Sequence, residues 1–323
     1  MWILVIALIE LGRIWLVITT VQKTLFFGND SYWSAALILI ADWFCLSVLT
    51  QVLNVFWPYY PSQYLRNNSW LGNWLRKRIR FQTVFWKDHV LDPNTKYIFA
   101  SHSHGVLSTL QLLTFMFHDN DPRWGNIPAN TVSTIGSELM IFPLTNLICR
   151  LLGARSISNL DAMLETEQHV SIVPGGAKEM SLCQCNTKDR VYILKRTGFL
   201  KRAYKLKRPV VPMITMDNYQ MYKIYAGPVW LQEFGLKQLN YGFPIFAFGS
   251  WGTIVPLPST VKSFVLPPFT AEENESEEDY ITRYYDGLRE LTKTFGVLLR
   301  LIEPDKLATH VFITKLDRQA HSE

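Results

Sequence analysis

The sequence predicts an α/β protein in which a mixed sheet is flanked by helices, preceded by an amino-terminal pair of membrane helices. Short apolar or β-branched runs alternate with longer helical patterns after residue 90, which is typical of an α/β core. Two apolar runs precede residue 60. Apolar residues make up 48% of the chain, which suits contact with lipid. We therefore expect a hairpin anchor over 1–60 and an α/β domain over 61–323.

The two apolar runs, 1–20 and 33–57, are predicted to form the hairpin. The second run exceeds the roughly 20 residues that one membrane pass needs. In the first run, Glu10 and Arg13 are three residues apart and would pair on one helix face. Pro58 ends the second run, because proline stops a helix. Two core helices of a soluble domain are the alternative interpretation.

Basic and aromatic residues are interleaved in the stretch that follows the second run. The basic residues are Arg66, Arg76, Lys77, Arg78 and Arg80, and the aromatic ones include Trp70, Trp74, Phe81, Phe85 and Trp86. Such a pattern favours a helix lying in the headgroup region of the cytosolic leaflet. The alternative is an ordinary amphipathic surface helix.

The elements of the core follow from the pattern of apolar residues, taken in order. Strands are expected at Tyr97–Ala100, Thr131–Ile135, Val170–Val173 and Pro209–Met216. Helices are expected at Val106–Phe117, Leu139–Leu152, Lys195–Leu206 and Tyr280–Ile302. Residues 271–279 are acidic and are predicted to be a solvated loop that runs into the last helix.

A small polar cluster, Ser101-His102-Ser103-His104-Gly105, lies between the first expected strand and the first expected helix. A turn of this kind presents side chains at the edge of a sheet, and Gly105 permits a sharp turn or a close ligand. If strand geometry continues, the two imidazoles point to opposite sides. One would then face a substrate while the other supports the turn. The alternative is two loop histidines without chemistry.

The charge, the cysteine spacing and the absence of certain motifs exclude several classes of protein. The net charge of +5 suits an anionic membrane surface or substrate, and it is too dispersed to indicate nucleic acid. The four cysteines match no zinc spacing, and they are expected to be thiols in a reducing compartment. A serine hydrolase is disfavoured because no Gly-x-Ser-x-Gly elbow is present. No metal site is expected, because His102 and His104 lack an evident third ligand.

The order of the motifs resembles the diacylglycerol acyltransferase type 2 family, which includes monoacylglycerol acyltransferases and wax synthases. The family's Tyr-Ile-Phe-Gly-x-His-Pro-His-Gly block is similar to residues 97–105, and its Gly-Gly-Ala-x-Glu block to 175–179. Its Arg-Lys-Gly-Phe block resembles 195–199, and its Trp-Gly-x-x-x-Pro segment resembles 251–256. The resemblance extends over about 64–295.

The resemblance implies a membrane-bound O-acyltransferase that moves a fatty acyl group from acyl-CoA to diacylglycerol and forms triacylglycerol. Acyl-CoA is then a substrate, and no cofactor is expected. Transfer needs a base and an oxyanion donor. His104 is the first candidate for the base, His102 the fallback, and Glu179 is expected to orient the histidine or a bound headgroup.

The remaining candidates would bind substrate. Backbone N–H groups at Gly175 and Gly176 can hold a phosphate or an oxyanion, although the glycine pair could equally be a plain turn. Gly105 would let a ligand approach. The basic candidates for the coenzyme A phosphates are Lys178, Lys195 and Arg196.

Departures from the family leave the acceptor open. Ser103 stands where the family has proline, Asn159 where it commonly has arginine, and Val265-Leu266-Pro267-Pro268-Phe269 lacks a family glycine. Alternatives are a monoacylglycerol acyltransferase, a wax ester synthase or an inactive lipid-binding relative. The expected location is the endoplasmic reticulum membrane, multi-pass with a cytosolic catalytic domain, or a lipid droplet surface. A homo-oligomer is also compatible with the sequence.

Overall fold

The computed structural model describes residues 62–67, 70–106, 108–119, 121–137, 140, 143–238, 245–253, 255–307 and 309. The predicted hairpin over 1–60 therefore lies outside the described residues. The chain divides into two compact units, Met1–Tyr60 with Glu138–Ile148, and Pro61–Ser137 with Cys149–Glu323. In the first unit, Asn146 Nδ2 donates a hydrogen bond to the carbonyl oxygen of Met140 at 2.8 Å.

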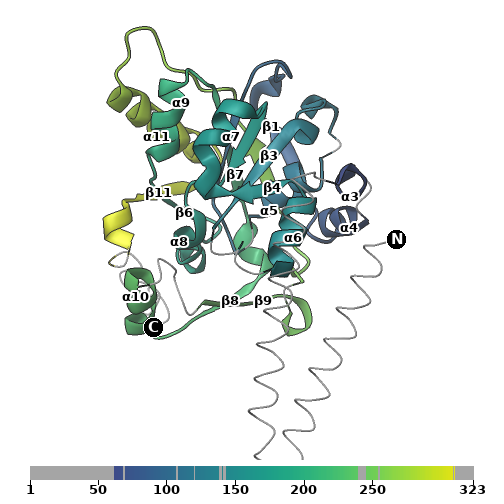
Figure 1. Cartoon of the computed structure of the whole chain (residues 1–323). Helices are drawn as coiled ribbons and strands as arrows, with labels where there is room; N and C mark the ends of the chain where they lie inside the picture. The colour runs from purple at the N-terminus through teal and green to yellow at the C-terminus, as the bar shows by residue number, and fades with distance from the viewer. Residues whose placement is uncertain are drawn as a thin grey trace, which may run out of the picture. The chain divides into compact units, whose positions relative to one another are not determined.

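The second unit contains a seven-stranded sheet (Figure 1). In spatial order its strands are β1 (Gln82–Phe85), β10 (Lys262–Val265), β7 (Val210–Met216), β2 (Ile98–His102), β5 (His169–Ile172), β3 (Thr131–Ile135) and β4 (Ala154–Ser156). Every neighbouring pair is parallel except β10 with β7. The predicted mixed α/β sheet is thereby confirmed. β2 is central, with β5 on one side and β7 on the other.

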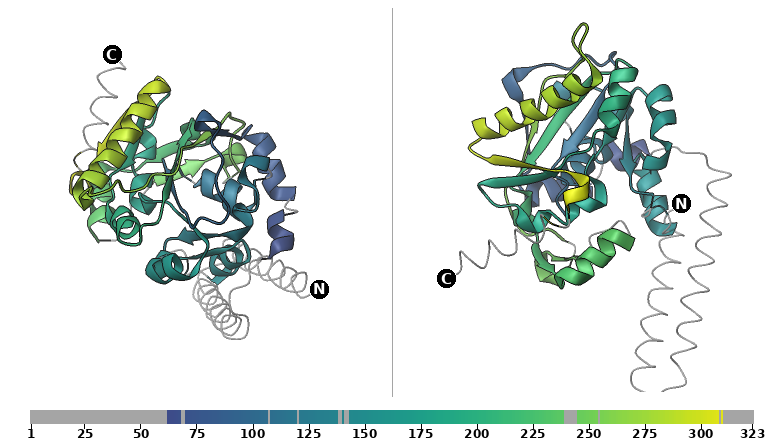
Figure 2. Two further views of the ribbon diagram at one scale, coloured as in Figure 1. Left: turned by 90° about the horizontal axis from the view of Figure 1, so that it is seen from above. Right: turned by 90° about the vertical axis from the view of Figure 1, so that its left-hand side faces the viewer.

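Two short strand pairs accompany the main sheet. β6 (Arg190–Leu194) pairs in parallel with β11 (Leu298–Ile302), and β8 (Lys223–Ala226) pairs antiparallel with β9 (Ile245–Phe248). Within the described residues the α-helices are α3 (Gln63–Asn67), α4 (Trp70–Arg78), α5 (Thr109–Gln111), α6 (Pro143–Leu151), α7 (Leu160–Thr166), α8 (Gly176–Met180), α9 (Gly198–Lys205), α10 (Val229–Gln238) and α11 (Glu277–Thr294). Figure 1 and the right panel of Figure 2 both show α10 and the β8–β9 pair at one end of this unit, below the central sheet.

Strand β2 is buried along its whole length, as expected for a strand with neighbours on both sides in a parallel sheet. Its aromatic residue Phe99 packs against Phe115 and Trp124, with ring centroids 4.8 and 5.8 Å apart. These rings belong to a core cluster that also includes Val211 and Met213 of β7. The core thereby fixes the position at which β2 ends, which is where the histidines lie.

Several sequence-based boundaries differ from the structure. The helix predicted at Val106–Phe117 is a short turn of α-helix followed by a π-helix over Leu112–Met116. The helix predicted at Tyr280–Ile302 is wrong at its end, because residues 298–302 form β11 against β6. The predicted acidic loop is confirmed only up to Ser276, because Glu277, Glu278 and Asp279 form the first turn of α11. Ser276 caps α11 by accepting a hydrogen bond from Asp279 N–H.

The predicted headgroup-facing helix is only partly present. Arg66 is 2% exposed and donates hydrogen bonds to the carbonyl oxygens of Phe115, Pro128 and Thr131. Phe85 is also buried, in β1. The surface prediction is therefore wrong for both residues, because the guanidinium satisfies main-chain acceptors and the ring fills the core. No helix of sufficient length and hydropathy to span a membrane occurs within the residues that the structure describes.

Candidate active site

The candidate site lies at the carboxyl end of β2, where the strand ends at His102 and the turn of residues 103–105 follows. We call this turn, together with His102, the histidine turn. In open α/β sheets this end of the strands is where ligands bind. The glycine pair of residues 175–176 follows β5, and Asp217 and Asn218 follow β7. Three segments that are far apart in the sequence therefore meet beside His102 and His104.

His102 ends β2 and is 1% exposed. Its Nε2 lies 2.8 Å from the hydroxyl oxygen of Tyr284 on α11, and the ring also lies near Phe199 of α9. Burial lowers the pKa of His102 to about 3, so the ring is neutral at physiological pH. The structure places this side chain in the core, as a support for the turn.

His104 is partly exposed. Its Nδ1 lies 2.8 Å from the carbonyl oxygen of Gly105, which can only accept a hydrogen bond, so Nδ1 carries the proton. The Nε2 lone pair is then available to accept a proton from a ligand. Burial of the ring by its surroundings lowers the pKa of His104, which keeps the imidazole neutral.

Glu179 lies on α8, next to the histidine turn, and is 2% exposed. Its Oε1 accepts a hydrogen bond from His104 N–H at 2.6 Å, and its Oε2 accepts one from Leu194 N–H at 3.0 Å. Burial raises the pKa of Glu179 to about 7, although these N–H groups and the charge of Arg196 act in the opposite direction. The carboxyl group therefore holds the main chain of the turn, whereas the sequence suggested contact with the imidazole or a headgroup.

The glycines serve different purposes. A Cβ atom on Gly175 would lie 2.0 Å from Glu179 Oε2, so glycine leaves the space that the carboxyl group occupies. Gly105 and Gly176 both have positive φ values, 65° and 55°, which glycine adopts without strain. Binding of substrate by these three residues stays a prediction.

Ser103 also has a positive φ, 65°. Proline, the residue at this place in the family's block, is locked near −65° and is incompatible with this turn. Asn218 supports the turn instead, because its Nδ2 donates hydrogen bonds to the carbonyl oxygen and Oγ of Ser103, each at 3.0 Å. Where the family has a proline, the turn here is therefore held by side-chain hydrogen bonds from the segment after β7.

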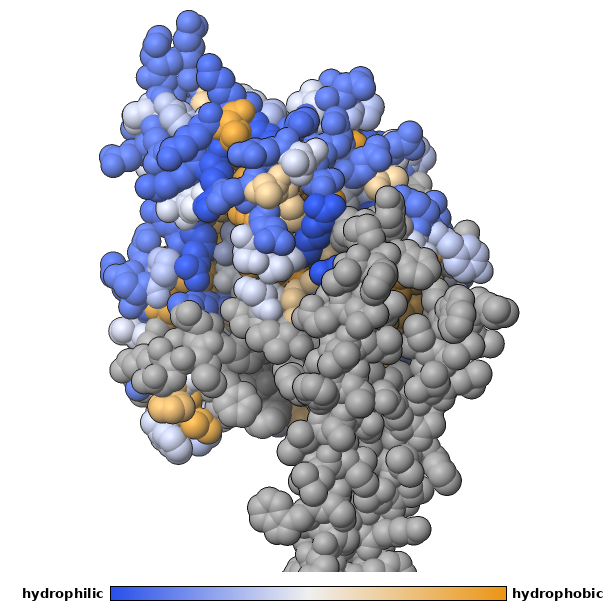
Figure 3. All heavy atoms as spheres, in the orientation of Figure 1, coloured by the Kyte–Doolittle hydropathy of each residue, from blue (hydrophilic) through white to orange (hydrophobic). Residues whose placement is uncertain are grey.

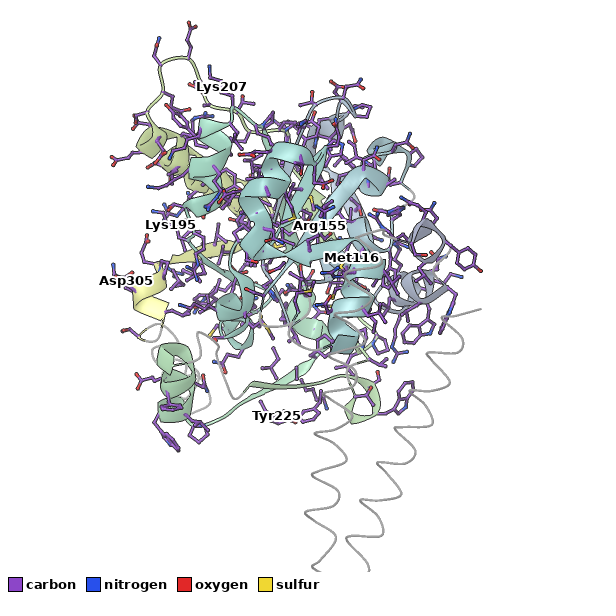
Figure 4. The ribbon with its side chains drawn as sticks, in the orientation of Figure 1. Met116, Arg155, Lys195, Lys207, Tyr225 and Asp305 are labelled. Carbon is purple, nitrogen blue, oxygen red and sulfur yellow. The ribbon has the colours of Figure 1, made fainter. Side chains whose placement is uncertain are left out.

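The basic candidates divide into two groups. Lys178 precedes Glu179 on α8, and Arg196 lies near both. Burial lowers the pKa of Lys178 and the charge of Arg196 adds to that effect, whereas the same charge opposes the rise that burial causes in the pKa of Glu179. Lys195 is instead paired with Glu303, with Nζ 3.3 Å from Oε1. Figure 4 shows Lys195 beside β6 and β11. Lys178 and Arg196 are therefore the better placed pair to meet an anion at the histidine turn.

Three supporting residues were not assigned a role from the sequence: Tyr284, Tyr285 and Asn218. Tyr285 donates to the carbonyl oxygen of Arg196 and accepts from its N–H at 2.9 Å, which fixes the chain that carries the guanidinium. Both tyrosines lie on α11, more than 80 residues beyond Arg196, so the local sequence pattern does not predict these contacts. Among the described residues no group of three His, Cys, Asp or Glu side chains could hold a metal ion.

This arrangement is that of an α/β enzyme with a neutral imidazole at the end of a central strand. The family described as "Diacylglycerol acyltransferase" matches residues 36–300. The chain belongs to that family, and it is an acyltransferase, as the sequence predicted.

Two animal relatives agree with this assignment. Zebrafish (Danio rerio) diacylglycerol O-acyltransferase 2 is 28% identical over 309 residues, which cover 85% of this chain and 84% of that protein. The mouse (Mus musculus) diacylglycerol O-acyltransferase 2-like protein 6 is 27% identical, over 70% of this chain and 74% of its own. The crystal structure of the 1-acyl-sn-glycerophosphate acyltransferase PlsC of Thermotoga maritima has a TM-score of 0.42 and 12% identity, and covers 79% of this chain and 96% of its own.

Proposed function

We propose that the enzyme transfers a fatty acyl group from acyl-CoA to the hydroxyl of diacylglycerol, with His104 as the general base. The observation that carries the proposal is the state of His104: its Nδ1 proton is held by Gly105 and its main chain by Glu179. Nε2 is then directed to accept a proton from a ligand. Membership of the diacylglycerol acyltransferase family supplies the substrate class.

The proposed reaction balances without a cofactor. The acceptor hydroxyl oxygen attacks the thioester carbonyl carbon, and His104 Nε2 takes the hydroxyl proton. The carbon–sulfur bond then breaks, the ester is complete, and the imidazolium returns the proton to the coenzyme A thiolate. Lys178 and Arg196 would meet the phosphates of coenzyme A.

The assay that tests this function uses membranes containing the enzyme, labelled acyl-CoA, and three acceptors: diacylglycerol, monoacylglycerol and a long-chain alcohol. We expect the ester of diacylglycerol to form fastest. If monoacylglycerol or the long-chain alcohol reacts faster, that acceptor would replace diacylglycerol in the proposed reaction. If the protein accumulates normally but forms no ester with any of the three acceptors, the remaining interpretation is an inactive lipid-binding relative.

We further propose that residues 1–60 anchor the enzyme in the endoplasmic reticulum membrane and that the catalytic domain faces the cytosol. The support is the pair of apolar runs followed by basic residues. Alkaline carbonate should leave the full chain in the membrane pellet. Asn274, in the sequon Asn274-Glu275-Ser276, is exposed, so its glycosylation in cells would contradict a cytosolic domain. A lipid droplet surface and a homo-oligomer stay alternatives that fractionation and sizing would decide.

A further inference from the structure

A cavity of about 570 Å³ lies at the β8–β9 end of the second unit, a volume within the usual range for ligand sites. Its side-chain lining comes from Lys223, Tyr225, Phe248, Ser250, Trp251 and Leu257. Lys223 and Phe248 are directly opposite in the β8–β9 register, so their side chains share one face of this strand pair. We call this cavity the aromatic groove.

Exposed aromatic residues are concentrated in the part of the sequence that forms the aromatic groove and α10. Of the seven large aromatic side chains that are exposed in the described residues, five lie between 225 and 251: Tyr225, Trp230, Phe234, Phe248 and Trp251. Figure 3 shows hydrophobic residues gathered at the lower left, where Figure 1 places α10. Figure 4 places Tyr225 on β8 at the same end of this unit. Tyrosine and tryptophan gather where a protein meets lipid.

The loop that carries Trp251 is held in a strained conformation. Trp251 has a φ of 56° and is 82% exposed, and such values in a bulky residue persist only where the surroundings impose them. Arg78 contacts this loop at two points, since its guanidinium lies 5.4 Å from the Trp251 ring and its Nε donates to the Pro256 carbonyl oxygen at 2.7 Å. A Cβ atom on Gly249 would lie 1.8 Å from the Val255 carbonyl oxygen, so the loop is closed on itself.

The aromatic groove connects to the histidine turn through the 3₁₀ turn η8 (Asn218–Met221). At one end of η8, Asn218 binds Ser103. At the other end, the carbonyl oxygen of Met221 accepts a hydrogen bond from the N–H of Leu257, which lines the groove. A single turn of four residues therefore separates the groove from the neighbour of His104.

The two flanks of the histidine turn differ in charge. β2 lies between β5 and β7, so α8, which follows β5, and η8, which follows β7, contact the turn from different sides. The α8 side has Lys178 and Arg196 near Glu179, which suits an anionic ligand. The aromatic groove, on the η8 side, has one charged lining residue, Lys223, which suits an uncharged lipid.

We propose that the aromatic groove binds an acyl chain of the neutral glycerolipid acceptor and guides its hydroxyl to His104 from the β7 side. Acyl-CoA occupies the opposite, basic side. This inference rests on the proposed function, because it names the route of one of its two substrates.

The test is photolabelling at equilibrium, which needs no turnover. The probe is a diacylglycerol with a diazirine near the end of one long acyl chain, in detergent or vesicles with the full-length enzyme. We expect adducts on peptides covering 223–257, removed by excess dioleoylglycerol. The His104→Ala enzyme should label equally well. If the wild-type enzyme is labelled but transfers no acyl group to any acceptor, the proposed function is overturned while the groove stands. Absent labelling of an active wild-type enzyme would overturn the groove alone.

Two further probes separate the sources of an acyl chain. A phosphatidylcholine with the same diazirine reports mere contact with the bilayer, and a diazirine-bearing acyl-CoA reports the donor. Labelling of 223–257 by phosphatidylcholine to the same extent, without competition by dioleoylglycerol, would overturn the proposal in favour of a membrane-contacting surface. Labelling by acyl-CoA alone would overturn the assignment to the acceptor.

A matched pair of variants completes the design. The double variant Tyr225→Ala with Trp251→Ala removes two aromatic rings of the groove, and Tyr64→Ala with Trp70→Ala removes the same residue types where both are 76% exposed. We expect the first to lower labelling at least about tenfold, which corresponds to about 1.4 kcal/mol, and to raise KM for dioleoylglycerol more than for dioctanoylglycerol. The second should leave both unchanged. Equal effects from the two variants would contradict the proposal.

Discussion

The carboxyl group of Glu179 accepts a hydrogen bond from the main-chain N–H of His104, at 2.6 Å. An acid beside a histidine is usually expected to contact the imidazole, and here it positions the backbone from which the imidazole projects. The same carboxyl group also accepts from Leu194 N–H, so one buried side chain joins the turn after β2 to β6. We call these two hydrogen bonds the Glu179 bridge.

A Gly175→Ala substitution should disturb the Glu179 bridge. The new Cβ would lie 2.0 Å from Glu179 Oε2, so the carboxyl group must move and leave main-chain donors unpaired. A buried donor without a partner costs about 1–3 kcal/mol, and we expect a lower midpoint of thermal unfolding in detergent together with reduced turnover. Gly287→Ala is the control, because it lies in α11 with no atom within 4 Å of the new Cβ. That change should stabilise by up to about 1 kcal/mol.

The protonation of Glu179 should appear in the pH dependence of stability. Burial raises its pKa from 4.5 to about 7, so the unfolded chain loses this proton at a lower pH than the folded protein does. Stability from this group is therefore full below pH 4.5 and is lost as pH rises through 7, by an amount on the order of 3 kcal/mol at about 1.4 kcal/mol per pKa unit. Glu179→Gln should lack this component when thermal unfolding is followed from pH 4.5 to 8. An unchanged profile in the variant would show that Glu179 ionises with its ordinary pKa.

The sequence predicted the parts of this site that depend on local pattern. The strand that ends at His102 and the glycine pair before Glu179 are visible as an apolar run and a turn signal. The histidine turn and the glycine pair follow the carboxyl ends of neighbouring parallel strands, as expected. The contacts of Tyr284 with His102 and of Asn218 with Ser103 span 182 and 115 residues. They depend on how strands are ordered in the sheet, which periodicity does not specify. β11 was missed for the same reason, since its apolar residues suit a continued helix as well as a strand beside β6.

Ser103→Pro, which restores the residue of the family's block, should impair this enzyme. The φ of 65° at Ser103 is out of reach for proline, and the hydrogen bond from Asn218 to Oγ would be lost. We expect a fall in turnover together with a lower unfolding midpoint. Ser103→Gly is the control for the backbone, because glycine accepts positive φ. Turnover at the wild-type level in Ser103→Pro would indicate that the turn reaches the family's conformation without cost.

Tyr284→Phe should separate support of the turn from catalysis. The change removes the hydroxyl that lies 2.8 Å from His102 Nε2, leaving a buried imidazole nitrogen without that partner at a cost of about 1–3 kcal/mol. We expect a lower midpoint of unfolding, while turnover per folded enzyme and its pH profile stay near wild type. A turnover loss as large as that of a base variant, with normal stability, would move His102 into the reaction.

The assignment of the base rests on comparing the two histidines directly. His104→Ala removes the partly exposed ring whose Nδ1 is bound to Gly105, and general-base assistance is typically worth about 10²–10⁴-fold. We expect turnover to fall by that order at saturating acyl-CoA while the protein accumulates in membranes at the normal level. His102→Ala removes a ring that is 1% exposed, so its main effect should be a smaller amount of folded enzyme. Ester formation per folded enzyme, measured for both variants, decides between them. If His102→Ala loses turnover and His104→Ala keeps it, the two roles are exchanged, and the buried imidazole must become accessible when substrate binds.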